Sequence, residues 1–274
     1  MKGLLGDTPD RAYIDKLLLF NQFAAPEIKD VIVSLDLREG QSVLDAGCGV
    51  GVITGWLSAH VLPKGAAVGV DLSFPHVTYA SKTNQHVLQG DLLKLPFAPN
   101  TFDLIWCSNT INHLINPLET VSHFKALLRA NGRLVIGQSG FLPEMFFAWD
   151  ARLEREVMLA NRRYYRDKYG LSEQSMSNYR SWFGLLREAG FTQVTAKTIT
   201  IERTVPLTHN DEVYFIECVF NGYWAHRVKP YLSQEDWQEL QDLCDPQSPK
   251  FCLKRRDFHH IQTYTIVIGS IVRQ

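Results

Sequence analysis

Short apolar runs alternate with amphipathic segments through the middle of the chain. The apolar runs have the length of buried strands and cover residues 42–46, 66–71, 86–89, 102–107 and 133–138. The segments between them place apolar residues at helical spacing and cover residues 52–59, 75–82 and 117–129. Strands that alternate with helices through short connections form a parallel sheet covered by helices on both faces. The pattern therefore predicts an α/β fold.

Elements are also predicted on both sides of this block. Two helices precede it, at 12–23 and 26–35. After it, the pattern predicts a helix at 176–189 and a strand at 192–202. A last strand is predicted at 264–272.

Two sections interrupt this regular pattern. The first, 139–175, is rich in aromatic residues and shows no clear periodicity. The second, 206–256, contains predicted helices at 211–228 and 234–244. No linker is long enough to separate independent domains, so we expect one domain with peripheral parts. These parts are a helical lid at 1–40 and helical substrate-cap insertions at 140–175 and 206–256, within a single domain of residues 1–274.

The first strand ends in a glycine-rich turn. Asp45 follows the apolar residues of the strand, and Gly47, Gly49 and Gly51 occupy alternate positions before Val52. Glycine has no Cβ, so such a turn adopts unusual backbone angles and lets a ligand lie against the main chain. The first amide groups of the following helix point toward that ligand. Because position 52 is Val, the spacing is G-x-G-x-G and not the G-x-G-x-x-G of dinucleotide folds.

Two further strands also end in acidic residues. Asp71 ends the second strand, about twenty residues after Gly51, and Asp91 with Leu92 follows the third. A carboxylate at the tip of the second strand is placed to accept hydrogen bonds from both hydroxyls of a ribose. NAD-binding folds share this feature, so an oxidoreductase remains an alternative. Asp71 also fits an acid at a helix N-terminus, before Ser73, and Asp91 also fits a strand-end cap.

Three more motifs follow in order. They are Leu95-Pro96-Phe97, Phe102-Asp103-Leu104-Ile105 and Asn131-Gly132. With the glycine turn and the two acids, they cover about 40–140 and resemble the class I S-adenosylmethionine (SAM)-dependent methyltransferases. The resemblance is to the small-molecule branch, which includes the ubiquinone, menaquinone and sterol methyltransferases. It implies a Rossmann-like sheet of seven strands, mostly parallel, whose antiparallel last strand lies beside 192–202.

The resemblance also implies SAM as the cofactor and indicates which residues bind it. They lie in the lid helix, in the glycine turn and at the strand tips: Tyr13, Asp45, Gly47, Cys48, Gly49, Asp71, Leu72, Asp91, Leu92 and Ser108. In such enzymes the acid after the third strand accepts a hydrogen bond from the adenine amino group, and the next apolar residue packs on the ring. These roles are predicted here for Asp91 and Leu92.

The segment after the fourth strand contains the catalytic candidate. Ligands of open α/β sheets bind beyond the carboxyl ends of the strands, and His113 is the only histidine in 108–117. A neutral imidazole suits a general base near pH 7, so His113 is our candidate for removing a proton from the methyl acceptor. A cofactor contact and a cap of the following helix are its alternative roles.

The caps bear on the substrate. Aromatic side chains are frequent in both caps, and such side chains line apolar ligand sites. Packed helices explain the same residues, including Phe215 and Phe220, equally well. Arg162, Arg163 and Arg166 either steer an anionic substrate or form an ordinary solvated helix face.

Composition excludes several function classes. The net charge is −1, so no global basic field attracts nucleic acid. The five cysteines are scattered and form no C-x-x-C pair, so we expect no metal site and a reduced, cytoplasmic setting. Asp7 precedes any long apolar run, and no apolar run is long enough to cross a bilayer, so we expect neither a secretion signal nor a membrane span.

These observations predict a methyltransferase that acts on a small, mostly apolar metabolite, at oxygen or alternatively at carbon. A second possibility keeps the SAM site but catalyses a cyclisation or rearrangement without methyl transfer. A nucleic-acid or protein methyltransferase is disfavoured, because Ser108-Asn109-Thr110-Ile111 places no proline or aromatic residue against a flipped base. The acceptor and the oligomeric state are not decided by the sequence.

Overall fold

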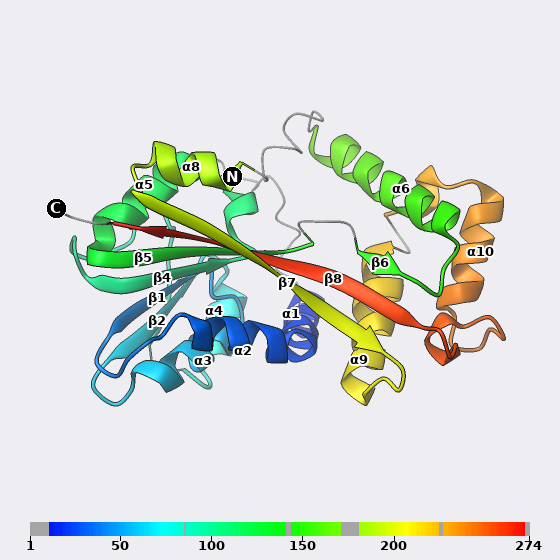
Figure 1. Ribbon diagram of the computed structural model, residues 1–274, viewed down its shortest axis with the longest axis horizontal. Helices are drawn as coiled ribbons and strands as arrows, with labels where there is room; N and C mark the ends of the chain where they lie inside the picture. Colours follow the sequence, from blue (N-terminus) through cyan, green and yellow to red (C-terminus); the bar gives the residue numbers. More distant parts are fainter. Residues whose placement is uncertain are drawn as a thin grey trace.

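A twisted sheet runs through the whole protein (Figure 1). The computed structural model describes residues 11–84, 86–114, 116–140, 144–170, 181–224 and 227–271. Seven strands follow one another across the sheet in the order β3 (Val87–Gln89), β2 (Ala66–Asp71), β1 (Ser42–Ala46), β4 (Phe102–Ser108), β5 (Leu128–Ser139), β8 (His259–Ser270) and β7 (Gln193–Thr204). The pairs from β3 to β5 are parallel, and β8 is antiparallel to both of its neighbours. The predicted sheet of seven strands with an antiparallel last strand is therefore confirmed.

One short strand was not predicted. β6 (Met145–Phe146) pairs with β8 at Ile261 and His260, beyond the point where β5 ends. β6 therefore continues the pairing along the edge of β8 that β5 occupies, by two residues. An isolated pair of residues has no alternation to reveal it in the sequence.

Helices cover both faces of the sheet (Figure 1). One face carries α2 (Ala25–Ser34) and α3 (Val52–Val61), whose residues Ile28 and Leu57 are fully buried. The other face carries α5 (Pro117–Leu127) and α8 (Trp182–Glu188), which bury Phe124 and Leu186. α1 (Arg11–Phe23) precedes α2, and α4 (Phe74–Ala80) contacts β2 and β3. The sheet is thus held between two hydrophobic layers, one on each face, and these layers fix the positions of the strand tips at its carboxyl edge.

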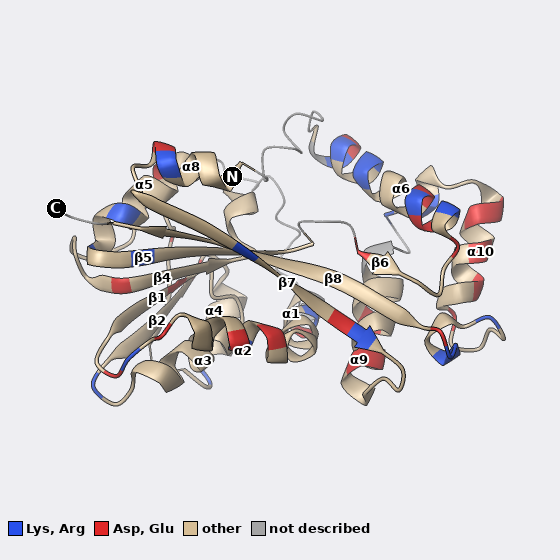
Figure 2. Cartoon of the chain, viewed as in Figure 1, with Lys and Arg blue, Asp and Glu red and all other residues tan. Residues whose placement is uncertain are grey.

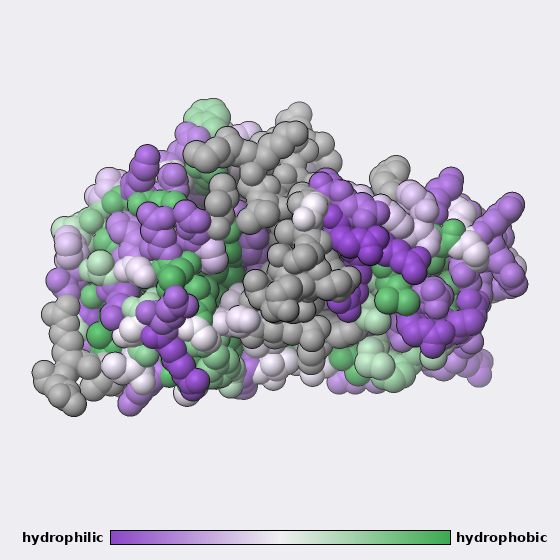
Figure 3. All heavy atoms as spheres, turned by 90° about the horizontal axis from the view of Figure 1, so that it is seen from above, coloured by the Kyte–Doolittle hydropathy of each residue, from purple (hydrophilic) through white to green (hydrophobic). Residues whose placement is uncertain are grey.

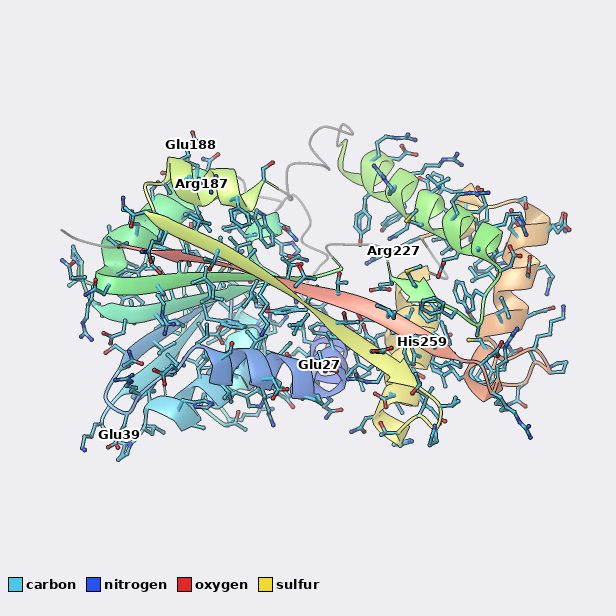
Figure 4. All side chains as sticks on the ribbon, viewed as in Figure 1. Glu27, Glu39, Arg187, Glu188, Arg227 and His259 are labelled. Carbon is cyan, nitrogen blue, oxygen red and sulfur yellow. The ribbon has the colours of Figure 1, made fainter. Side chains whose placement is uncertain are left out.

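The β7–β8 ladder extends past the sheet and joins it to a second group of helices (Figure 1). At its far end, the Arg203 guanidinium lies on the Phe23 ring, 4.6 Å from the ring centroid. It also donates to Glu27 Oε1 (2.6 Å) and Asp211 Oδ1 (2.9 Å). Glu27 lies beneath the ladder in Figure 4. Arg203 therefore ties the end of β7 to the N-terminal helices and to the second cap.

The section 139–175, where the α/β alternation breaks and a helical cap was predicted, contains one long helix, whose bounds were not predicted. α6 (Ala151–Tyr169) is a helix of 19 residues, capped by Asp150, whose side chain accepts from the amides of Arg152 and Leu153. Leu153, Val157 and Ala160 are buried along one side of it. The helix has an apolar stripe at helical spacing, but frequent charged and aromatic residues between these positions obscure it in the sequence.

Two other predicted helices differ in extent. α9 (His209–Val213) starts with a capping box formed by Thr208 and Asp211, and it continues as a π-helix, η3 (Tyr214–Trp224). The helix predicted at 176–189 is seen as α8, which starts at Trp182; residues 176–180 lie outside the described residues. The predicted helix at 234–244 is confirmed as α10 (Gln234–Cys244).

Candidate cofactor and acceptor site

The glycine turn between β1 and α3 is held by backbone hydrogen bonds. Gly47, Gly49 and Gly51 all have positive φ, at 81°, 53° and 78°. The amides of Gly47 and Cys48 both donate to the Val70 carbonyl oxygen, at 2.7 and 2.9 Å. The turn is therefore fastened to β2 from behind, and its open side faces the carboxyl edge of the sheet.

Gly47 is also required by a close approach. A Cβ at this position would lie 2.2 Å from Thr110 Oγ1, which is well inside van der Waals contact. The absent side chain therefore lets the loop after β4 lie directly against the turn after β1.

Asp71 at the tip of β2 joins the turn to the next helix. Its Oδ2 accepts from the Gly49 amide at 2.9 Å, and its Oδ1 accepts from the Ser73 amide at 2.8 Å. His76 Nδ1 lies 3.3 Å from the same Oδ1. Burial alone raises the pKa of Asp71, but the hydrogen bonds from His76, Ser73 and Gly49 outweigh it and hold the pKa below its ordinary value. The carboxylate is therefore ionised, with lone pairs left for a ligand.

Apolar surface lies open beside Asp71. Leu72 is 70% exposed and Phe74 is 65% exposed, although both are large hydrophobic residues. Such exposure of neighbouring apolar side chains indicates a surface that a ligand or partner covers. Leu72 is among the predicted cofactor contacts, whereas Phe74 was not singled out in the sequence. Phe74 lies three residues after Asp71 at the tip of β2, and this position is the sequence signal that could have marked it.

α1 lies over this region. The Tyr13 ring stacks on the His76 ring with centroids 5.7 Å apart and planes at 20°. Leu17 Cδ1 would lie 3.3 Å from a Cβ at Gly49. The part of the predicted lid that the structure describes therefore contacts the glycine turn and the helix after Asp71; residues 1–10 lie outside the described residues.

The third strand tip presents Asp91 to solvent. Asp91 is exposed, and its Oδ1 accepts from the Leu93 amide at 3.0 Å. Leu92 points the other way and is buried, with 7% of its surface exposed. Asp91 is thus open to a hydrogen-bond donor, while Leu92 contributes mainly to the core beneath it.

Asp45 and Cys48 lie behind the turn and not on its open side. Asp45 is 2% exposed, and its Oδ2 accepts from Thr54 Oγ1 at 2.6 Å. Burial raises the pKa of Asp45 to about 7, against the opposing hydrogen bond from Thr54. Cys48 is also buried, and burial raises the pKa of its thiol. Both residues support the turn from within the fold.

The tip of β4 is fixed by polar links to neighbouring strands. Ser108 Oγ lies 2.8 Å from the hydroxyl of Tyr264 on β8. A Cβ at Gly137 would lie 2.0 Å from that hydroxyl, so glycine on β5 makes room for the Tyr264 side chain. Asn109 Oδ1 accepts from the Ser139 amide at 2.8 Å. Gly137, Ser139 and Tyr264 were missed in the sequence, because nothing local links them to Ser108.

His113 ends a short 3-10 helix, η1 (Ile111–His113), just after this tip. Its amide donates to the Thr110 carbonyl oxygen at 2.9 Å. Because Thr110 also contacts Gly47, the loop with His113 is held close to the glycine turn. The structure therefore brings His113 to the same edge of the sheet as Asp71 and Asp91.

The aromatic residues of the caps pack mostly with one another. Phe146 stacks on Trp149 with ring centroids 4.7 Å apart, and Phe215 and Phe220 are buried in the same cluster. Phe141 and the side chains of Tyr169, Tyr223 and Trp224 lie outside the described residues. The described aromatic residues of this cluster therefore form the core of the second helical group.

The basic residues of α6 face solvent. Arg162, Arg163 and Arg166 are exposed. Figure 2 shows Lys and Arg along α6, and the face seen in Figure 3 is mostly hydrophilic there. Arg166 Nε donates to Asp167 at 3.0 Å. The described geometry is that of a solvated helix face.

Within residues 11–271 and outside their gaps, no group of three or more His, Cys, Asp or Glu side chains is arranged to hold a metal ion. No helix in this part of the chain is both long enough and apolar enough to cross a bilayer.

The middle of the chain is similar to known methyltransferases. A family model described as "Methyltransferase domain" matches residues 44–136. The chain is 32% identical to the 2-phytyl-1,4-naphtoquinone methyltransferase of Thermosynechococcus vestitus, over 37% of this chain and 48% of that protein. It is 26% identical to phosphoethanolamine N-methyltransferase 3 of Arabidopsis thaliana, over 76% of this chain and 43% of that protein. It therefore spans less than half the length of either relative.

A solved structure agrees on the fold. The YcgJ protein of Bacillus subtilis superposes with a TM-score of 0.53 at 18% identity, covering 89% of this chain and 97% of that one. Residues 44–136 thus match a methyltransferase domain, and quinone and phosphoethanolamine methyltransferases are among the relatives that the chain resembles. The cofactor that this likeness supports is SAM. The ionised carboxylate of Asp71, the exposed apolar side chain of Leu72 beside it and the exposed carboxylate of Asp91 after the neighbouring strand β3 have the chemistry to hold the adenosyl part of SAM.

Proposed function

We propose that the chain transfers the methyl group of SAM to a small, mostly apolar metabolite, at an oxygen atom. The observation that carries this proposal is the arrangement of the first three strand tips. The glycine turn, the ionised Asp71 bonded to it and the open Asp91 lie on neighbouring strands β1, β2 and β3. Ligands of open α/β sheets bind at this edge.

Each predicted contact has a role in holding the cofactor. We assign the ribose hydroxyls to Asp71 and the adenine amino group to Asp91. Leu72 offers its exposed side chain to the adenine, and Ser108 lies at the methionine end. Tyr13 belongs to a lid that excludes water from the site.

The other predicted contacts act through the backbone or from beneath. Gly47 and Gly49 admit the cofactor against the main chain. Asp45 and Cys48 hold the turn in shape, and Leu92 supports the surface under Asp91.

The protein supplies alignment and a base to the reaction. When bound, SAM provides a methyl group on a cationic sulfur, which an acceptor attacks from the side opposite the sulfur. Alignment of the reacting groups accounts for much of the acceleration in such displacements. We propose that His113 removes the proton from the acceptor hydroxyl, because it is a titratable group on the loop that Thr110 holds against the glycine turn.

The relatives leave the acceptor atom open. One is named as an N-methyltransferase of phosphoethanolamine, and another as a methyltransferase of a naphtoquinone. Oxygen is proposed because a group able to accept a proton lies at the tip of β4, and carbon is the second choice. An apolar acceptor is proposed over an anionic one because the arginines of α6 have the geometry of a solvated helix face. The lid at 1–40 and the caps at 140–175 and 206–256 enclose that acceptor in this proposal.

A transfer assay tests the proposal. The protein is incubated with methyl-labelled SAM and a panel of phenols, hydroquinones, amines and carboxylic acids. The proposal requires labelled product together with an equal amount of S-adenosylhomocysteine. Product formed without S-adenosylhomocysteine would indicate a cyclisation or rearrangement. Failure to bind SAM in a calorimetric titration would refute the cofactor site itself.

A further inference from the structure

The hydrogen bonds of Gln138 fix the orientation of the amide of Asn112, the residue before His113. Gln138, at the end of β5, donates through Nε2 to the Ser139 carbonyl oxygen at 3.0 Å. Its Oε1 is therefore the atom turned toward Asn112, and it accepts from Asn112 Nδ2 at 2.5 Å. Because Nδ2 is the donor of this bond, Oδ1 of Asn112 points away from Gln138.

The Oδ1 atom of Asn112 has no hydrogen-bond partner among the described residues, and it is closed to solvent. Nearly all buried polar atoms in folded proteins are paired, since an unpaired one costs free energy comparable to a lost hydrogen bond. Rotating the amide would not help, because Nδ2 would then be the unpaired atom and two oxygens would face each other. The contact with Gln138 therefore leaves Oδ1 of Asn112 as an unpaired acceptor.

The position of Asn112 points to the binding site. It lies in η1, two residues after Thr110, whose Oγ1 is 3.4 Å from the Gly47 carbonyl oxygen, and one residue before His113. Gln138 attaches it to the tip of β5. Asn112 therefore lies between the glycine turn and β5, on the side of β4 away from Asp71 and Asp91.

We propose that Asn112 is a ligand-binding residue whose Oδ1 accepts a hydrogen bond from an N–H or O–H group of a bound ligand, and that Gln138 positions it. The inference rests on the proposed function. Two sources supply this chemistry at the β4 tip. One is the ammonium group at the methionine end of the cofactor, and the other is the hydroxyl group of the methyl acceptor.

Asn112 does not titrate, so its contribution differs from that of a base. Removing the acceptor oxygen weakens binding without changing the pH dependence of the rate. A change at His113 alters that pH dependence. The two neighbouring residues are therefore separable by experiment.

Calorimetry of Asn112→Leu tests the first source. S-adenosylhomocysteine carries the ammonium group, and 5′-methylthioadenosine lacks it. If the ammonium group is the donor, the variant binds S-adenosylhomocysteine about 3- to 10-fold more weakly and binds 5′-methylthioadenosine like the wild type.

A second titration tests the acceptor as the source. 1-Naphthol carries a hydroxyl donor, and 1-methoxynaphthalene is its match without the donor. Each is titrated into the complex with S-adenosylhomocysteine. If the acceptor hydroxyl is the donor, the wild type prefers 1-naphthol, and Asn112→Leu lowers this preference by about 3- to 10-fold. The inference is overturned if Asn112→Leu changes neither the first ratio of affinities nor the second.

Controls separate this inference from other failures. Asn116→Leu makes the same chemical change at an exposed site four residues away and leaves both ratios at wild-type values. Gln138→Leu releases the amide of Asn112 and lowers the affected ratio in the same direction, so it serves as the test if Asn112→Leu does not fold. Wild-type protein that fails to bind S-adenosylhomocysteine contradicts the proposed function. Wild-type binding that Asn112→Leu and Gln138→Leu leave unchanged contradicts only the role of Asn112.

Discussion

The Gly47→Ala substitution perturbs the contact between the glycine turn and the loop after β4. Gly47 has φ of +81°, and an added Cβ would lie 2.2 Å from Thr110 Oγ1 and 2.4 Å from Thr110 Cγ2. Thr110 cannot simply rotate away without loss, because Oγ1 donates to the Ser108 carbonyl oxygen at 2.8 Å. Either the turn or the loop must therefore move.

Two costs add in this variant. A residue with a Cβ in the left-handed region costs about 1–2 kcal/mol. Overpacking of a close contact costs about a further 1–3 kcal/mol. We therefore expect the free energy of unfolding to fall by about 2–5 kcal/mol. We also expect affinity for S-adenosylhomocysteine to fall by about tenfold or more, equivalent to about 1.4 kcal/mol, because we propose the turn as the surface on which the cofactor lies.

Urea unfolding and calorimetric titration measure these two effects. Gly170→Ala is the matched control, since Gly170 has φ of +63° and an added Cβ there meets nothing within 4 Å. It should show the backbone cost alone and bind S-adenosylhomocysteine like the wild type. The double variant Gly47→Ala with Thr110→Ala removes the two nearest atoms and should recover part of the loss.

The reasoning is refuted if Gly47→Ala binds S-adenosylhomocysteine as tightly as the wild type. It is also refuted if Gly47→Ala and Gly170→Ala destabilise the protein equally, because the contact with Thr110 would then contribute nothing.

Three further substitutions test other parts of the site. Asp45 has a folded-state pKa near 7, so between about pH 4 and 7 the folded chain keeps a proton that the unfolded chain has lost, and the free energy of unfolding falls as pH rises through this range. Asp45→Asn should remove this pH dependence, which urea unfolding at pH 5 and pH 8 measures. A variant with the same difference in stability between the two pH values as the wild type would contradict the assignment. Tyr264→Phe removes the hydrogen bond to Ser108 and should lower the free energy of unfolding by about 1 kcal/mol, whereas no change by urea titration would show the bond to be without consequence. His113→Ala should lower kcat by about 100-fold or more with little change in affinity for S-adenosylhomocysteine; near-normal turnover would remove His113 as the base.

The strand tips were predictable because their signals are local. An apolar run that ends in Asp45, Asp71 or Asp91 marks both the strand and its carboxyl end within a few residues. The alternate glycines after Asp45 add a turn that only certain backbone angles allow. The resemblance supplied the predicted position of the antiparallel last strand, and the pairing of β8 with β5 and β7 confirms that position.

The links that hold these tips together were not predictable. Ser108 and Tyr264 are 156 positions apart, and their hydrogen bond depends on the absence of a side chain at Gly137. Asp45 looked like a ligand contact but is buried against Thr54. These hydrogen-bond partners depend on how the strands and helices pack in three dimensions, and the local spacing of residues in the sequence does not predict them.

The bounds of the helix in the first cap were not given by local patterns, whereas α10 in the second cap was predicted correctly. The stripe formed by Leu153, Val157 and Ala160 identifies α6 only once its partners are known. Its exposed positions carry arginines, which in the sequence favoured a solvated face over an anion site. Tertiary burial on one side decides that this segment is a helix.

A crystal structure of the complex with S-adenosylhomocysteine tests the central claim most directly. The account predicts the adenosine part along the turn from Gly47 to Gly51, with the ribose hydroxyls at Asp71 and the adenine amino group at Asp91. Density for the ligand at another edge of the sheet, or an empty turn at saturating ligand, would contradict it.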